Sequence, residues 1–125
     1  MNTECCGELV ARCFQARTDA HVAHLTTRSY AQHKALNEFY DEIVDLADGF
    51  AESAQGRFDA LLKYPRTAPR SSSVDTAKPI TIVEGLRDWI DDNRDECCDE
   101  SELQNIIDEI VGLCNSTLYK LRFLS

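Results

Sequence analysis

The chain has three histidines, and all of them lie in one stretch, HVAHLTTRSYAQH, at residues 21–33. Imidazole groups together with carboxylates bind divalent transition metals such as iron and zinc. Two carboxylates, Asp48 and Glu52, follow one helical turn apart. About 22 Å of helix separates His33 from Asp48, so one chain cannot place both on a metal. If these residues lie on one helix, two antiparallel copies of that helix, related by a two-fold axis, could share a metal ion.

The spacing of apolar residues predicts the elements that position these groups, namely four helices and no strand. The first helix covers residues 4–25, and the second runs from Tyr30 to about residue 54. Ser29 and Gln32 have the spacing of a capping box at the start of the second helix. The third helix is expected around residues 82–90, and the fourth begins near Asp99.

A long loop, at about residues 63–80, separates the second helix from the third. It contains all three prolines and three consecutive serines. Seventeen extended residues reach about 55 Å, whereas a 24-residue helix is only about 36 Å long. The loop can therefore return along the whole bundle, which is the connectivity of ferritin-like folds. We expect one all-α domain over residues 1–125, a ferritin-like four-helix bundle with a crossover between helices 2 and 3.

The run AQHKALNEFYDEIVDLADGFAE resembles the Dps-type mini-ferritins, and the similarity covers about residues 18–56. The four positions that match the spacing of that family's ligands are His21, His33, Asp48 and Glu52. The resemblance implies a ferroxidase site between two subunits, with these residues binding iron, and a homodimer or higher homo-oligomer. His24 and Asn37 are additional candidate ligands.

The chain departs from the mini-ferritin pattern at Asn37, where that family has an aspartate. It also lacks the small helix usual in the long connection and a lysine-rich tail. Fewer anionic ligands stabilise Fe(III) less well, so zinc at the inter-subunit site is an alternative to iron. Hydrogen-bonded polar residues in a bundle groove are a further interpretation of the same positions. The chain also resembles a group of small phage-encoded helical proteins, through HxxHL…SYAxHxALxxFY and the ending LYKLRFL.

A second metal candidate is the acidic segment DDNRDECCDESE at residues 91–102. Its oxygen-bearing side chains fall at the ligand positions of an EF-hand calcium loop: Asp91, Asn93, Asp95, Asp99 and Glu102. Glu96, however, occupies the position where that loop needs a glycine. The alternative is an acidic corner that favours the N-terminus of the next helix.

The six cysteines contain no CxxC motif, so zinc-knuckle and thioredoxin-type sites are not supported. The expected topology brings two adjacent pairs to one end of the bundle, and we predict them as disulfide candidates: Cys5, Cys6, Cys97 and Cys98. Such disulfides could form within the chain or to neighbouring molecules. The alternative is that the cysteines are buried free thiols.

The net charge is −9, and residues 84–109 account for it. Without a cluster of lysines and arginines, direct binding of nucleic acid is not expected, and no apolar run has the length of a membrane span. Glu4 and Glu8 stand where a secretory signal would be basic. We therefore expect the chain in the cytoplasm of a bacterial host or in a virion.

Two functions follow from these observations. The first is a phage-encoded ferritin-like structural or accessory module, oligomeric, associated with other virion proteins, cross-linked through cysteines and without enzymatic activity. The second is an active mini-ferritin that oxidises and binds Fe(II). Asn37 and the cysteine content favour the first.

Overall fold

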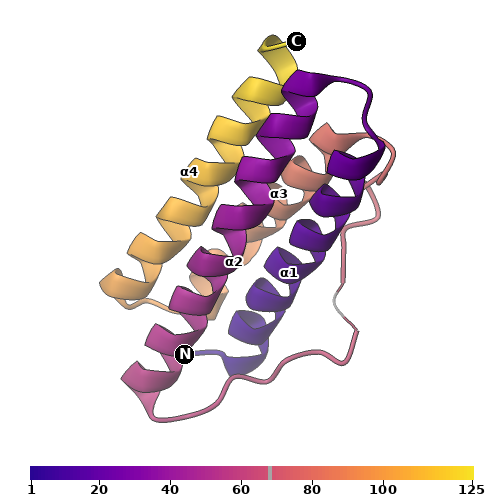
Figure 1. Ribbon diagram of the computed structural model, residues 1–125. Coiled ribbons are helices and arrows are strands. Elements are labelled where there is room, and N and C mark those ends of the chain that lie inside the picture. Colours follow the sequence, from indigo (N-terminus) through magenta and orange to yellow (C-terminus); the bar gives the residue numbers. More distant parts are fainter. Residues whose placement is uncertain (68) are drawn as a thin grey trace.

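The computed structural model describes residues 1–67 and 69–125 and shows a helical bundle (Figure 1). These residues form four helices and no strand: α1 (Thr3–Thr26), α2 (Tyr30–Phe58), α3 (Pro79–Cys97) and α4 (Ser101–Phe123). The prediction of an all-α chain is confirmed. α1 packs against α2 and α3, and α4 packs against the same two helices.

The helix boundaries agree with the predictions at some ends and differ at others. Ser29 caps α2 as expected, because its Oγ accepts a hydrogen bond of 3.2 Å from the Gln32 N–H. α2 continues past the expected end near residue 54 and past Gly56, and it ends at Phe58 with Asp59 as its C-cap in the left-handed conformation, with φ of 50°. α3 begins earlier than predicted, with Pro79 at its first position, where the missing N–H costs nothing. α4 begins at Ser101, after Glu100 as its N-cap.

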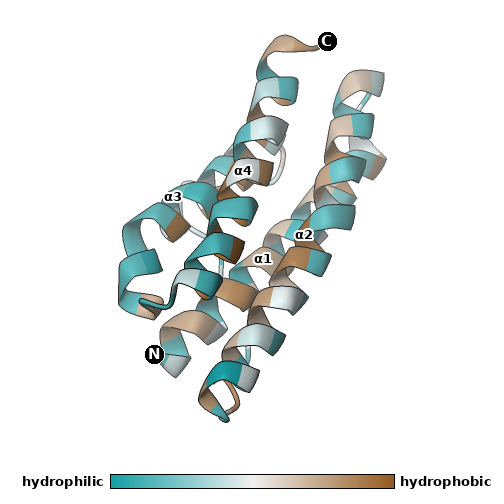
Figure 2. Ribbon diagram, turned by 90° about the vertical axis from the view of Figure 1, so that its left-hand side faces the viewer, coloured by the Kyte–Doolittle hydropathy of each residue, from teal (hydrophilic) through white to brown (hydrophobic). Residues whose placement is uncertain are grey.

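One apolar core lies between the four helices, and its contributors follow helical spacing. Figure 2 shows hydrophobic and hydrophilic residues alternating around each helix. Phe14, which the spacing also places inside, is 38% exposed. The largest fully buried side chains are Phe39, Phe50, Leu9, Leu36, Ile43, Ile82, Ile90, Leu103, Ile107, Ile110, Leu118 and Val10. Among the described residues, none of the helices combines the length and the apolar character needed to cross a bilayer.

The connection between α2 and α3 runs back along α1 to the opposite end of the bundle (Figure 1). At its start, the Lys63 N–H donates a hydrogen bond of 3.2 Å to the carbonyl of Thr3. After residue 68, the Arg70 guanidinium pairs with the buried Asp19 through two hydrogen bonds, of 2.7 and 3.0 Å. This bidentate geometry is a strong form of ion pair, and it anchors the connection to the C-terminal half of α1.

Two helical glycines leave room for the connection to pack closely. A Cβ on Gly7 of α1 would overlap the carbonyl group of Lys63, and a Cβ on Gly85 of α3 would overlap the Val74 side chain. Helical glycine is otherwise unfavourable, by about 1 kcal/mol relative to alanine. At these two positions the close approach of the connection offsets that cost.

We expect Gly7→Ala to lower the free energy of unfolding by about 1–3 kcal/mol, because the Lys63 backbone must move to admit the methyl group. Gly49→Ala is the matched control, since nothing lies within 4 Å of an added Cβ there. It should raise the free energy of unfolding by up to about 1 kcal/mol. Urea denaturation measures both. Equal stability of the two variants would contradict the packing of Lys63 on Gly7.

Candidate functional site

The histidines surround the turn between α1 and α2, and two of them form a reciprocal pair. The rings of His24 and His33 stack with their centroids 3.6 Å apart. The Nδ1 of His24 lies 2.7 Å from the His33 carbonyl oxygen, and the Nδ1 of His33 lies 2.8 Å from the His24 carbonyl oxygen. Because a carbonyl only accepts hydrogen bonds, each Nδ1 carries a proton. The pair thus joins the end of α1 to the start of α2, and each ring retains Nε2 for any other contact.

His21 belongs to a second polar group beside this pair. Its ring stacks on Tyr40 at 4.2 Å. The Tyr40 hydroxyl donates to the Asn37 side-chain oxygen at 3.0 Å, and the Asn37 amide donates to Asp41 at 2.9 Å. Asn37 therefore orients Tyr40 and uses both ends of its amide. As a neutral and already hydrogen-bonded group, it is a poor ligand for Fe(III).

The predicted ligands Asp48 and Glu52 are exposed on α2, toward the end remote from the histidines. Their separation from His33 remains about 22 Å of helix, so a single chain does not bring the four predicted ligands together. Within residues 1–67 and 69–125, no group of three or more His, Cys, Asp or Glu side chains is arranged to hold a metal. The site between two copies stays a prediction.

The calcium loop predicted at residues 91–102 is wrong. Asp91, Asn93, Asp95 and Glu96 lie within α3, which continues to Cys97. Only residues 98–100 separate the two helices, so a twelve-residue loop cannot form. The chain continues as helix because Glu96 does not favour the positive φ that a calcium loop needs.

An ion-paired corner takes the place of that loop. Arg94 donates to the side chain of Gln104 at 2.9 Å and pairs with Asp108 on α4. Gln104 in turn donates to the carbonyls of Arg94 and Cys98, at 3.1 and 2.8 Å. The polar residues of this region therefore hold α3 to α4.

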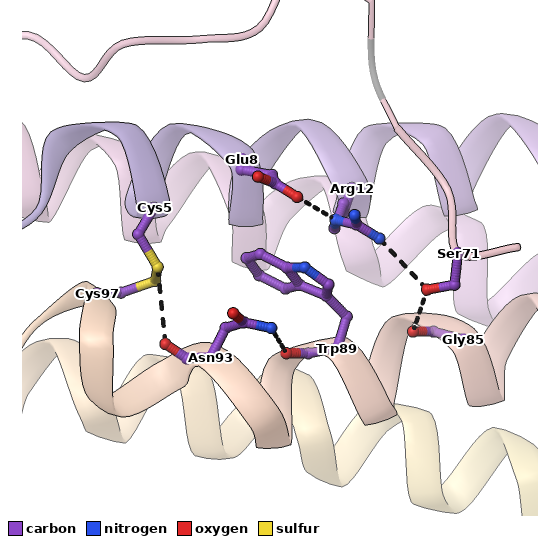
Figure 3. A network of polar contacts seen from close by, with 8 residues as sticks. All are labelled: Cys5, Glu8, Arg12, Ser71, Gly85, Trp89, Asn93 and Cys97. Atoms are coloured by element: carbon purple, nitrogen blue, oxygen red, sulfur yellow. Dashed lines mark hydrogen bonds and ion pairs between the residues drawn. A yellow bond between two sulfur atoms is a disulfide. The ribbon is translucent and has the colours of Figure 1, made fainter.

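Two adjacent cysteine pairs meet where α1 begins and α3 ends, as the topology predicts. We call Cys5, Cys6, Cys97 and Cys98 the cysteine end. A disulfide joins Cys5 to Cys97 (Figure 3), with Cα atoms 5.0 Å apart. The Asn2 N–H donates to the Cys97 carbonyl at 2.9 Å, which adds a backbone link beside the disulfide.

Cys6 and Cys98 are thiols buried next to that disulfide. The Cys6 sulfur lies 3.4 Å from the Cys97 carbonyl oxygen. A hydrogen bond between the two thiols raises the pKa of Cys6, and burial adds to this rise. The same hydrogen bond lowers the pKa of Cys98. The Gln104 amide, 3.8 Å from the Cys98 sulfur, lowers this pKa as well. Cys6 therefore retains its proton and stabilises the thiolate form of Cys98.

The remaining cysteines form a third pair that sequence reasoning missed. Burial raises the pKa of Cys13, and the neighbouring Cys114 raises it further. Burial also raises the pKa of Cys114 to about 12. Both thiols stay protonated at neutral pH and behave as small apolar groups. Their apolar helical spacing marked them as core residues, but spacing alone could not show that they are neighbours.

A network of polar contacts around Arg12 lies beside the cysteine end (Figure 3). The sequence patterns did not predict it. The Arg12 guanidinium is 4.7 Å from the centre of the Trp89 ring on α3. It pairs with Glu8 at 2.7 Å and donates to the Ser71 hydroxyl at 3.3 Å. Ser71 donates to the Gly85 carbonyl at 3.5 Å. This single side chain thus links α1, α3 and the long connection.

We expect His24→Phe to lower the free energy of unfolding by about 1–3 kcal/mol, because it keeps an aromatic ring but leaves the His33 carbonyl without its donor. His21→Phe is the matched control. It preserves the stack on Tyr40, so its effect should stay within about 0.5 kcal/mol. Urea denaturation at neutral pH compares them. An equal loss in both variants would show that the reciprocal hydrogen bonds do not hold the turn.

Comparisons with known proteins point to a phage family. The chain is 32% identical over 101 residues to an uncharacterised 14.6 kDa protein from the mobD–ri intergenic region of Enterobacteria phage T4. The match covers 81% of this chain and 75% of the T4 protein, and it supports the predicted similarity to small phage-encoded proteins. No solved structure matches the chain significantly. A family model matches residues 24–121, most of the chain. The chain therefore belongs to the family of unknown function DUF5856.

Proposed function

We propose that this chain is a ferritin-like structural or accessory module of a bacteriophage, acting in an oligomer or with other virion proteins. The observation that carries the proposal is the Cys5–Cys97 disulfide. A reducing cytosol keeps most thiols reduced, whereas disulfides persist outside it. A small bundle with a disulfide between distant parts of the chain suits a particle that leaves its host.

The order of the helices supports the ferritin-like part of the proposal. α1 and α2 form an antiparallel pair, and the connection then returns along α1 before α3 and α4 begin (Figure 1). α1 therefore packs against both α2 and α3. A long connection of this kind distinguishes ferritin-like bundles from simple up-and-down bundles.

Exposed apolar side chains support contact with other molecules. Leu25, Tyr30 and Phe123 are 70%, 74% and 73% exposed. They belong to the end of the bundle where α1 ends, α2 begins and α4 ends (Figure 1). Apolar residues grouped on a surface often mark interaction sites, and a second copy or a virion protein would cover these.

The arrangement of the cysteines favours a disulfide within the chain over disulfides between molecules. Cys5 is bonded to Cys97, and the four free cysteines of the chain are all buried. A disulfide to a second protein chain would need one of these sulfurs at the surface, because a folded partner cannot insert its own cysteine into a buried corner. We therefore propose that the particle holds this chain through non-covalent contacts, with the disulfide stabilising the bundle itself.

Purified particles of the encoding phage test the structural function. We expect washed particles, opened in denaturant with an alkylating agent, to contain the chain with Cys5 bonded to Cys97. Non-reducing tryptic mapping should show residues 1–12 linked to residues 95–120. An infected-cell lysate treated identically is the control and should contain more of the reduced chain. Absence of the chain from washed particles would refute this function.

A working mini-ferritin is the competing function. In its favour, Asp48 and Glu52 are exposed on α2, where a second copy could bring its His21 and His33 to them. If the chain is structural, Fe(II) in air should oxidise no faster with the purified protein than with buffer. His33→Ala should change nothing. Iron oxidation above background that is lost in Asp48→Asn would instead establish the ferroxidase, and bound zinc lost in the same variant would establish a zinc site.

A further inference from the structure

The cysteine end carries a thiol pair that is not part of the Cys5–Cys97 disulfide. We propose that Cys6 and Cys98 are a second, exchangeable disulfide pair, oxidised by small-molecule disulfides of the glutathione class, with Cys98 reacting first. This inference does not depend on whether the chain enters a particle. It concerns the chemistry of the isolated bundle.

The Cys5–Cys97 disulfide brings the neighbouring residues Cys6 and Cys98 close to each other. Cys6 directly follows Cys5, and Cys98 directly follows Cys97. The Cα atoms of Cys5 and Cys97 are 5.0 Å apart, within the usual range for bonded cysteines. The Cys6 sulfur lies 3.4 Å from the Cys97 carbonyl oxygen, and the Cys6 and Cys98 thiols shift each other's pKa in opposite directions, as neighbouring groups do. The two thiols are therefore neighbours, and we infer that side-chain rotation brings their sulfurs together.

The surroundings of the two thiols differ, and the difference sets the order of reaction. Cys6 is 0% exposed within α1, whereas Cys98 is 4% exposed in the short corner after α3. The Gln104 amide and the Cys6 thiol both favour the Cys98 thiolate. A thiolate is the attacking species in disulfide exchange. Cys98 is therefore the entry sulfur, and Cys6 resolves the mixed disulfide.

The exchange balances in two steps. The Cys98 thiolate attacks one sulfur of glutathione disulfide, whose S–S bond breaks, and one glutathione leaves as its thiolate. Cys6 then attacks the Cys98 sulfur, the bond between Cys98 and glutathione breaks, and the departing glutathione thiolate takes up the Cys6 proton. Two protein thiols become one disulfide, and the two electrons reduce glutathione disulfide to two glutathione molecules.

Cys13 and Cys114 provide an internal comparison. They also lie near each other, but both are 0% exposed and burial raises the pKa of each. Cys13 has no partner that favours its thiolate, and at Cys114 the rise in pKa caused by burial outweighs the favourable charge of Arg87. We therefore expect this pair to remain reduced under conditions that oxidise Cys6 and Cys98.

The test uses the full chain at neutral pH in glutathione buffers that range from reducing to oxidising. Samples are quenched with acid, unfolded and alkylated, and intact mass gives the number of free thiols. The starting protein has four free cysteines, and we expect two at the oxidising end. Tandem mass spectrometry should place the new bond between Cys6 and Cys98.

Two variants separate the steps. Cys6→Ser should accumulate one glutathione on Cys98, because the serine hydroxyl keeps a hydrogen-bond donor beside Cys98 but cannot resolve the mixed disulfide. Cys98→Ala should take up no glutathione and form no second disulfide. Circular dichroism confirms that each is folded.

Three results would overturn the proposal: four free thiols in the wild type at the oxidising end, a new bond that involves Cys13 or Cys114, or unchanged thiol loss in folded Cys98→Ala. The first two need only the wild-type chain, so the proposal stays testable if a variant fails to fold.

Discussion

The packing of the α2–α3 connection against α1 is the constraint on which the other long-range contacts depend. The connection can lie close only because Gly7 and Gly85 have no side chain to displace it. The buried Asp19 holds it through the half-exposed Arg70, and removing Arg70 would leave the buried carboxylate without its partner, at a cost in free energy. With the connection held, α3 runs beside α1 and its last residues reach the start of α1, where the cysteines meet.

Much of this fold could be predicted because its signals are local. The spacing of apolar residues predicted the four helices, and Ser29 caps α2 as the capping-box pattern predicts. The helix ends were less predictable. α2 passes Gly56 because an exposed glycine weakens a helix without ending it, and Asp59 supplies the left-handed cap instead. The acidic residues after Trp89 looked like a loop, but they continue α3 to Cys97, and the basic Arg94 among them bonds to Gln104 and Asp108 of α4.

The candidate site could be predicted only in part, because its chemistry depends on side-chain direction. Topology alone brought the two adjacent cysteine pairs to one end, yet it could not show that Cys5 bonds to Cys97 while Cys6 faces Cys98. The histidines show the same limit. Their spacing suits a metal site, but the Nδ1 atoms of His24 and His33 are occupied by each other's backbone carbonyls. No sequence pattern reveals such a use, because it requires the turn to be already packed.

The cysteine end also has a consequence for the order in which the bundle is built. Near it, Asn2 is hydrogen-bonded to Cys97 and Thr3 to Lys63. The first residues of the chain therefore find these partners only after much later residues have been synthesised. During synthesis, α1 and α2 can pair while the rest of the chain is still absent, since domains form from the N-terminus onward. The Cys5–Cys97 bond can close only after residue 97 has left the ribosome. It therefore distinguishes finished chains from truncated ones, whose Cys5 and Cys6 lack these partners.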